Sequence, residues 1–241
     1  MHEKVIMEIK EAVNEVIEAL ESFGDPNRKA KIATYAPTSM EVLGATNPDI
    51  HEMIREVKQK YRNWNERYWI DFCIALVDTG IFECQGMAYE LLGRNRKLLA
   101  ALSGKDVNAL AKNLDNWASV DGFAVGIHGV LWGRGVVTDL DIEELLKSGD
   151  PWQRRVAVVS TVALNMKSRG GTGDTPRTLA VCKAVVDDHH DMIQKALSWA
   201  LRELSKRDRE AVMAFMDQHQ NRLARRVLRE VSHKLEYGTK N

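Results

Sequence analysis

The sequence is poor in the residues that mark several classes of protein. Only three cysteines occur in 241 residues, which excludes a disulfide scaffold and favours a reducing compartment. Five prolines and 16 glycines exclude a collagen-like chain, and the ordinary apolar content excludes a disordered tail protein. The longest apolar runs fall far below the ~18 residues needed to span a bilayer, and the acidic start Met1-His2-Glu3 is unlike a signal peptide. We therefore expect a cytoplasmic protein with no membrane partner.

Net charge is also absent, because 34 Lys and Arg residues balance 34 Asp and Glu residues. The balance hides an asymmetry. Residues 1–150 carry 17 basic and 24 acidic side chains, whereas residues 151–241 carry 17 and 10. The C-terminal part could therefore hold a polyanion, or it could simply present a solvated basic surface.

Apolar residues recur at helical spacing along almost the whole chain, and no segment shows the sustained alternation of a β-strand. This pattern predicts an all-α protein. The expected helices cover residues 3–23, 47–57, 64–77, 85–92, 106–114, 116–132, 138–147, 150–166, 176–187, 190–204, 208–218 and 222–236. Short helices joined by short turns favour stacked antiparallel pairs, and a spacing of about 40 residues is typical of HEAT-like repeats. We predict one HEAT-like domain over residues 1–241, a superhelical α-solenoid with a concave face for a large ligand.

Three segments place aromatic and charged side chains where an amphipathic helix does not need them: residues 116–121, 150–155 and 195–206. In the first segment, Trp117 and Asp121 are four residues apart and therefore share a helix face. Each also has a purely structural interpretation. Asp121 could be a favourable partner of the helix dipole, and Trp117 could pack against the residues of the next turn.

The other two segments have the same two interpretations. Segment 150–155 starts a helix at Pro151 and sets Arg154 and Arg155 close behind, where the helix dipole disfavours cations. This pair could form an exposed ion-pair turn. Trp199, in the third segment, lies among small and aliphatic residues and could belong to the core.

Together the three segments resemble the DNA alkylation repair family, the HEAT-repeat alkylpurine DNA glycosylases, over roughly residues 30–236. The resemblance implies a superhelix that holds duplex DNA and hydrolyses the N-glycosidic bond of 3- or 7-alkylated purines without extruding the base. It implies that Trp117 and Trp199 flank the lesion nucleotide, that Asp121 is the catalytic carboxylate and that Arg155 holds the backbone. The further DNA-binding residues that we expect are Arg154, Tyr35, Lys167, Arg169, Arg202 and Lys206.

The expected chemistry suits these residue types. An alkylated purine is cationic and leaves readily, so positive charge builds on the sugar, where a carboxylate stabilises it and orients water. Indole faces attract cations, and guanidinium groups bind phosphate. We expect no cofactor and no metal, since no His or Cys has a convincing ligand spacing, and we expect a monomer. The alternative is a non-catalytic HEAT-like module that binds branched or bent DNA or a protein. The acidic N-terminal half and the divergent segment 35–52 favour this alternative.

Three other features of the sequence are weaker candidates for a site. The glycine-rich segment 168–176 lacks the Gly-Lys-Ser/Thr of a nucleotide-binding loop and is expected to be a flexible connection. The pair His189-His190 is expected to be solvent-exposed at a helix start rather than to bind metal. The arginines of segment 222–229 trace a basic stripe that could be a solvated face or the end of a DNA groove.

Overall fold

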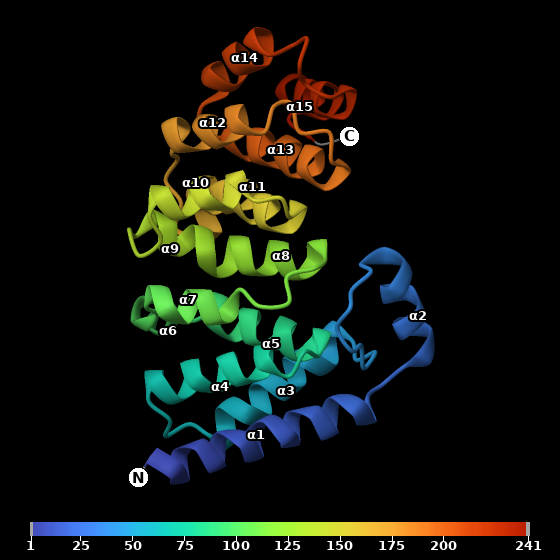
Figure 1. The fold of residues 1–241 in the computed structure, drawn as a ribbon, viewed down its shortest axis with the longest axis vertical. Coiled ribbons are helices and arrows are strands. Elements are labelled where there is room, and N and C mark those ends of the chain that lie inside the picture. The colour runs from blue at the N-terminus through green and yellow to red at the C-terminus, as the bar shows by residue number, and fades with distance from the viewer. Residues whose placement is uncertain (1, 240–241) are drawn as a thin grey trace. The chain divides into compact units, whose positions relative to one another are not determined.

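The computed structural model describes residues 2–239, with side chains from Val5 onward. Helices account for all the regular structure in this range apart from one isolated β-bridge between Glu41 and Ile81 (Figure 1). The prediction of an all-α protein is therefore confirmed. Within the described range, no helix is both long enough and apolar enough to cross a bilayer.

The chain divides into two compact units, Met1–Phe123 and Ala124–Asn241. The boundary falls inside the expected helix 116–132, where α8, a π-helical turn (η1) and α9 follow one another along the chain. The expectation of one domain over the whole chain stays a prediction.

Unit 1 contains α1 (His2–Ser22), α2 (Pro26–Tyr35), α3 (Asn47–Lys60), α4 (Glu66–Asp78), α5 (Phe82–Gly93), α6 (Arg96–Ala101), α7 (Gly104–Leu110) and α8 (Trp117–Phe123). Most of these helices pack as neighbouring pairs: α1 on α3 and α4, α3 and α4 on α5, and α5 on α8. The helix α2 is the exception, because it lies to the side of these pairs (Figure 1). Ile32 is the one residue of α2 classed as buried.

Unit 2 contains η1 (Ala124–His128), α9 (Gly129–Gly133), α10 (Asp139–Lys147), α11 (Pro151–Asn165), the 3-10 turn η2 (Lys167–Arg169), α12 (Thr175–Ala184), α13 (Asp191–Leu204), α14 (Arg209–Gln218) and α15 (Arg225–Tyr237). The helix α11 forms its centre, because it packs on η1, α9, α10, α12 and α13. Every residue from Arg155 to Asn165 is buried, which explains the long apolar run in this helix. Next along the chain, α13 packs on α15.

Local capping chemistry sets many of the helix starts. Pro26 and Pro151 follow Asp25 and Asp150, and each aspartate accepts a backbone N–H of the first turn. Capping boxes begin α3, α7 and α10, where a Ser or Thr and an Asp three residues later bond reciprocally to the backbone. These signals are local in sequence, so most expected helices match the observed ones to within a few residues.

Two helices were not predicted, α2 and α6. Gly24-Asp25-Pro26 has the residues typical of a helix end and follows the expected helix 3–23, but Asp25 also caps α2 and Pro26 begins it. The helix α6 has six residues, too few to show a helical period, and Asn95 caps it by accepting the N–H groups of Lys97 and Leu98. In addition, the expected helix 106–114 ends at Leu110.

Candidate functional site

The N-terminus of α8 carries the first group of expected site residues. Asn116 is fully buried, and its side-chain oxygen accepts the backbone N–H of Ser119 at 3.0 Å, which caps the helix. Trp117 and Asp121, both half-buried, then follow one turn apart. The structure therefore places the indole and the carboxylate on one face of the same short helix, as the spacing predicted.

Tyr35, at the C-terminus of α2, meets Trp117. The two rings form an edge-to-face pair with centroids 4.9 Å apart and an interplanar angle of 89°. The indole Nε1 of Trp117 also donates a hydrogen bond of 2.8 Å to the carbonyl oxygen of Tyr35. This bond uses the only polar atom of the indole, while the residue Tyr35 stays 69% exposed. Unit 1 thus presents a partly exposed pair of rings, Tyr35 and Trp117, at the start of the helix that bears Asp121. We call this pair the aromatic corner.

The segment that follows Tyr35 is fixed by two carboxylates that sequence analysis did not single out. Asp115 binds Thr38 and Ser39, and the buried Glu83 accepts the backbone N–H groups of Leu43 at 3.0 Å and Gly44 at 2.8 Å. Between these anchors, the backbone of Glu41 bonds to that of residues 80 and 82 in the isolated bridge. The divergent segment is therefore an ordered connection.

Gly44 is a required glycine in this connection. Its φ is +91°, and a Cβ built there would lie 2.6 Å from the carbonyl oxygen of Asp25.

Partial burial raises the pKa of the Asp115 carboxyl. Hydrogen bonds from Ser39, Thr38 and Asn116 outweigh this effect, so the net pKa lies below its ordinary value. The group is therefore an anion at neutral pH and acts only as a hydrogen-bond acceptor.

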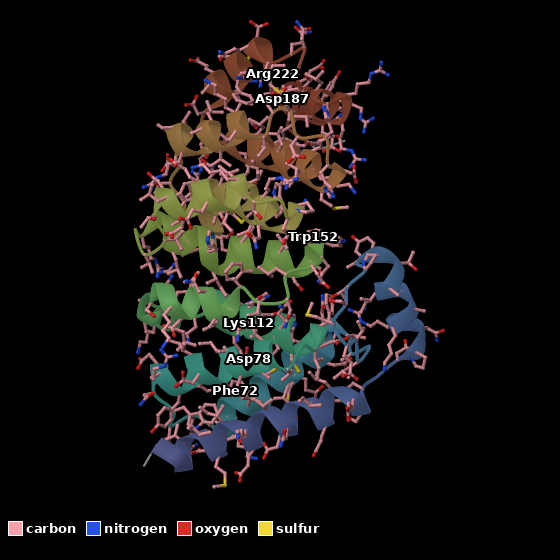
Figure 2. All side chains as sticks on the ribbon, in the orientation of Figure 1. Phe72, Asp78, Lys112, Trp152, Asp187 and Arg222 are labelled. Atoms are coloured by element: carbon pink, nitrogen blue, oxygen red, sulfur yellow. The ribbon has the colours of Figure 1, made fainter. Side chains whose placement is uncertain are left out.

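Arg154 and Arg155 begin α11 in unit 2. The Nε of Arg154 lies 2.8 Å from Asp188, and its NH1 donates to the carbonyl oxygens of Ser148 and Gly149. Arg155 is only 4% exposed, and one of its nitrogens donates to the carbonyl oxygen of Met192. Both guanidinium groups therefore take part in the internal structure of unit 2. Trp152, one turn earlier, is half-buried and is labelled in Figure 2.

Trp199 lies on a mixed stripe along α13. The stripe consists of Lys195, Trp199 and Arg202 on α13 and Lys206 in the turn after it, which recur at three- and four-residue spacing and are all half-buried or exposed. Trp199 is therefore not sealed in the core. Lys206 is 50% exposed on its side chain and pairs with Glu203 at 2.6 Å.

Arg202, in the middle of the stripe, is held by neighbouring polar groups. Its NH2 lies 3.8 Å from Glu230 of α15, and its Nε donates to Ser198 at 3.2 Å. Ser198 donates in turn to Glu230 at 2.6 Å. This network fixes the guanidinium beside Trp199 on the same helix.

Lys167 and Arg169 lie in η2, after the C-terminus of α11. At 1.5 Å per residue, Lys167 lies roughly 18 Å along the chain direction from Arg155. Arg169 lines a pocket of about 220 Å³ together with Arg134, Arg177 and the glycines of the 170–173 loop. Lys167 and Arg169 therefore lie at the opposite end of α11 from Arg154 and Arg155.

Metal-binding and thiol chemistry find no support in the described residues. No group of three or more His, Cys, Asp or Glu residues within that range could hold a metal ion. The cysteines at positions 73, 84 and 182 are all fully buried. Burial raises the pKa of each thiol, in the case of Cys84 to about 12.

The fold and these residues define an all-α protein of stacked helix pairs that presents indole, phenol and carboxylate groups at helix ends. A sequence profile described as DNA alkylation repair enzyme matches residues 16–235, and the chain belongs to this family. Membership indicates a role in the repair of alkylated DNA. A search of curated proteins finds no match.

A solved structure shows the same fold. It is described as a predicted DNA alkylation repair enzyme from Enterococcus faecalis, and it is 20% identical to this chain with a TM-score of 0.68. The similarity covers 90% of this chain and 98% of the other. The predicted family and the α-solenoid-like fold class are therefore confirmed.

Proposed function

We propose that the protein is a DNA glycosylase that hydrolyses the N-glycosidic bond of cationic 3- or 7-alkylpurines in duplex DNA, without extruding the base. The observation that carries the proposal is the corner in unit 1, where Trp117, paired with the ring of Tyr35, begins the helix that bears Asp121 one turn further on. Aromatic rings provide a surface for sugar and base, and a carboxylate next to them suits a reaction that creates positive charge on the sugar.

The reaction needs few groups from the protein. The bond between the sugar C1′ and the purine nitrogen breaks, and its electron pair leaves with the purine, which becomes neutral. The sugar passes through a cationic state that Asp121 stabilises. A water oxygen then forms the new bond to C1′ and loses its proton to the carboxylate or to solvent. No acid is needed to protonate the leaving base, and no metal or cofactor enters the proposed reaction.

The stripe on α13 is the second DNA-binding surface in this proposal. Trp199 and Lys206 are accessible from solvent, so an indole and an ammonium group can contact a sugar and a phosphate. Three arginines have an indirect role in this proposal, because their guanidinium groups already bond to partners within unit 2. They stabilise the structure that carries the stripe: Arg154, Arg155 and Arg202.

The direct test is release of free base from methylated duplex DNA. We expect the purified protein, as a monomer, to release 7-methylguanine or 3-methyladenine, also in the presence of EDTA. Asp121→Asn should lower the single-turnover rate by ~100-fold or more, as the loss of one electrostatic contact to the transition state does. The matched control is Asp217→Asn on α14, where the carboxylate is exposed and lies outside the proposed site. Its rate should equal that of the wild type.

Two outcomes would contradict the proposal. An unchanged rate in Asp121→Asn would overturn the role of this carboxylate. Tight binding of branched or bent duplexes, with no base released from any alkylated substrate, would establish the non-catalytic module instead. Uracil and mismatched bases should not be released, because they are neutral and leave poorly.

A further inference from the structure

Asp115 accepts four hydrogen bonds close to the proposed site. Its Oδ1 accepts the Thr38 hydroxyl at 2.6 Å and the Asn116 side-chain amide at 3.1 Å. Its Oδ2 accepts the backbone N–H of Ser39 at 2.5 Å and the Ser39 hydroxyl at 2.6 Å. Four donors therefore occupy the approximately four acceptor positions of one carboxylate, and three of them come from a segment 76 or 77 residues away.

The same carboxylate is joined to the start of α8. Asn116 donates to Asp115 with its side-chain nitrogen and caps the helix with its side-chain oxygen. Trp117 is the next residue. Asp115 thus joins the Thr38-Ser39 turn to the capping residue directly before Trp117, while the Trp117 indole bonds separately to Tyr35.

Tyr35 depends on this network because α2 has few other attachments. The backbone N–H of Asp25 bonds to Gly44, the Arg28 guanidinium donates to the carbonyl oxygen of Ala45 at 2.8 Å, and Ile32 is buried. All three contacts lie toward the start or middle of the helix. Beyond them, the C-terminal end is held by the buried Ala36, by the Trp117 bond to Tyr35 and by the Asp115 bonds to the turn that follows.

We propose that Asp115 is a positioning residue for DNA binding, which holds Tyr35 against Trp117 by fastening the Thr38-Ser39 turn to the α8 N-terminus. This inference rests on the proposed function, since it assigns Asp115 to the DNA-binding surface of that same site. Without the carboxylate, the turn is released and the exposed phenol ring loses its fixed place beside the indole. Bound DNA then contacts Trp117 but not the ring of Tyr35.

A double-mutant cycle tests the proposal. The probe is an unmodified, fluorescein-labelled DNA duplex, and the readout is its dissociation constant from fluorescence anisotropy. Tyr35→Ala should weaken binding by about tenfold, which is ~1.4 kcal/mol and within the range expected for one aromatic contact to a nucleotide. Asp115→Ala should weaken binding by about as much. The double variant should bind no more weakly than Tyr35→Ala alone, because Asp115 acts through Tyr35.

Two further variants keep the cycle interpretable. Ser39→Ala removes one exposed hydroxyl donor and should give a smaller loss of affinity that also vanishes in the Tyr35→Ala background. Asp141→Ala, the matched control, removes the carboxylate that caps α10 by bonding Thr138, and it should leave DNA affinity unchanged. If Asp115→Ala does not fold, the Ser39→Ala cycle carries the test alone.

Hydrogen exchange supplies a readout that does not depend on DNA. The Ser39 amide donates to Asp115, so its exchange should accelerate in Asp115→Ala while amides in α4 stay protected. Additive losses of affinity in the double variant, or unchanged exchange at Ser39, would overturn the positioning role. A failure of base release with the coupling intact would overturn the glycosylase activity and leave the positioning role standing.

Discussion

At the scale of single residues, His128 links stability to pH. Its Nδ1 lies 2.8 Å from the Ser160 hydroxyl, which donates to the carbonyl oxygen of Val156. Burial lowers the pKa of His128 from 6.5 to about 4, because the charged form is disfavoured inside the protein. The unfolded chain therefore binds the proton more readily. The contribution of this group to stability is complete above pH 6.5 and is lost as the pH falls toward 4.

We therefore expect His128→Asn to reduce the difference in unfolding free energy between pH 7 and pH 4.5. The wild-type difference from this residue should be on the order of 2 kcal/mol. Urea unfolding at the two pH values measures it. His189→Gln is the control, because this side chain is exposed. Equal pH dependence in wild type and His128→Asn would show that burial does not govern this titration.

The site shows which residues a sequence can reveal. Trp117 and Asp121 were predicted to share a face because a four-residue spacing in a helix fixes this geometry. The bonds of Asp115 could not be predicted, since its partners lie more than seventy residues away and no local pattern marks them. Arg155 had a clear sequence signal, but its burial depends on α13, whose packing on α11 only the fold reveals.

At the scale of elements, the close approach of α9 and α11 depends on a glycine. A Cβ built on Gly129 would lie 2.3 Å from the carbonyl oxygen of Ser160 and 2.8 Å from the Cβ of Ala163. Gly129→Ala should therefore lower the free energy of unfolding by about 3 kcal/mol, the upper range for an overpacked core. Denaturant unfolding at neutral pH measures this loss.

The matched control is Gly104→Ala at the start of α7, where a Cβ meets no atom within 4 Å. This variant should gain about 0.5 kcal/mol, because alanine restricts the unfolded chain. Equal effects of the two substitutions would contradict the close packing of α9 on α11.

Helix boundaries were more predictable than helix partners. Proline and capping residues mark the starts of α3, α11 and α12 in the sequence itself. The helix α2 escaped prediction because one Asp-Pro pair both follows α1 and begins α2. Its position beside the helix pairs of unit 1 depends on Ile32, Arg28 and the backbone of residues 44 and 45, none of which has a periodic signature.

At the scale of the whole molecule, the C-terminal excess of basic residues predicts how salt affects DNA binding. On α15 and the turn before it, Arg222 pairs with Asp187, both labelled in Figure 2, and Arg226 lies 3.1 Å from Asp191. Arg225 and Arg229 are exposed on the same helix. If this helix contacts the backbone of the duplex, each phosphate contact adds ~0.9 to the slope of log affinity against log salt concentration.

Arg229→Ala should therefore flatten this slope by about one and weaken binding equally for all duplex sequences. Arg62→Ala removes an equally exposed guanidinium from the connection between α3 and α4 in the acidic part of the chain, and it should leave the slope unchanged. Anisotropy titrations over a range of salt concentrations compare the two variants. The reverse result would place the DNA against the acidic part and show that α15 is only a solvated face.

The buried thiols have a consequence for a member of a DNA alkylation repair family. Electrophiles that methylate DNA also methylate proteins, and a thiolate is among the best nucleophiles they meet. Cys73, Cys84 and Cys182 are each 0% exposed, and burial raises the pKa of all three thiols. At neutral pH, each thiol is therefore both protonated and shielded from solvent. The folded protein therefore offers these reagents no reactive thiolate, so its cysteines are protected from the same electrophiles that alkylate DNA.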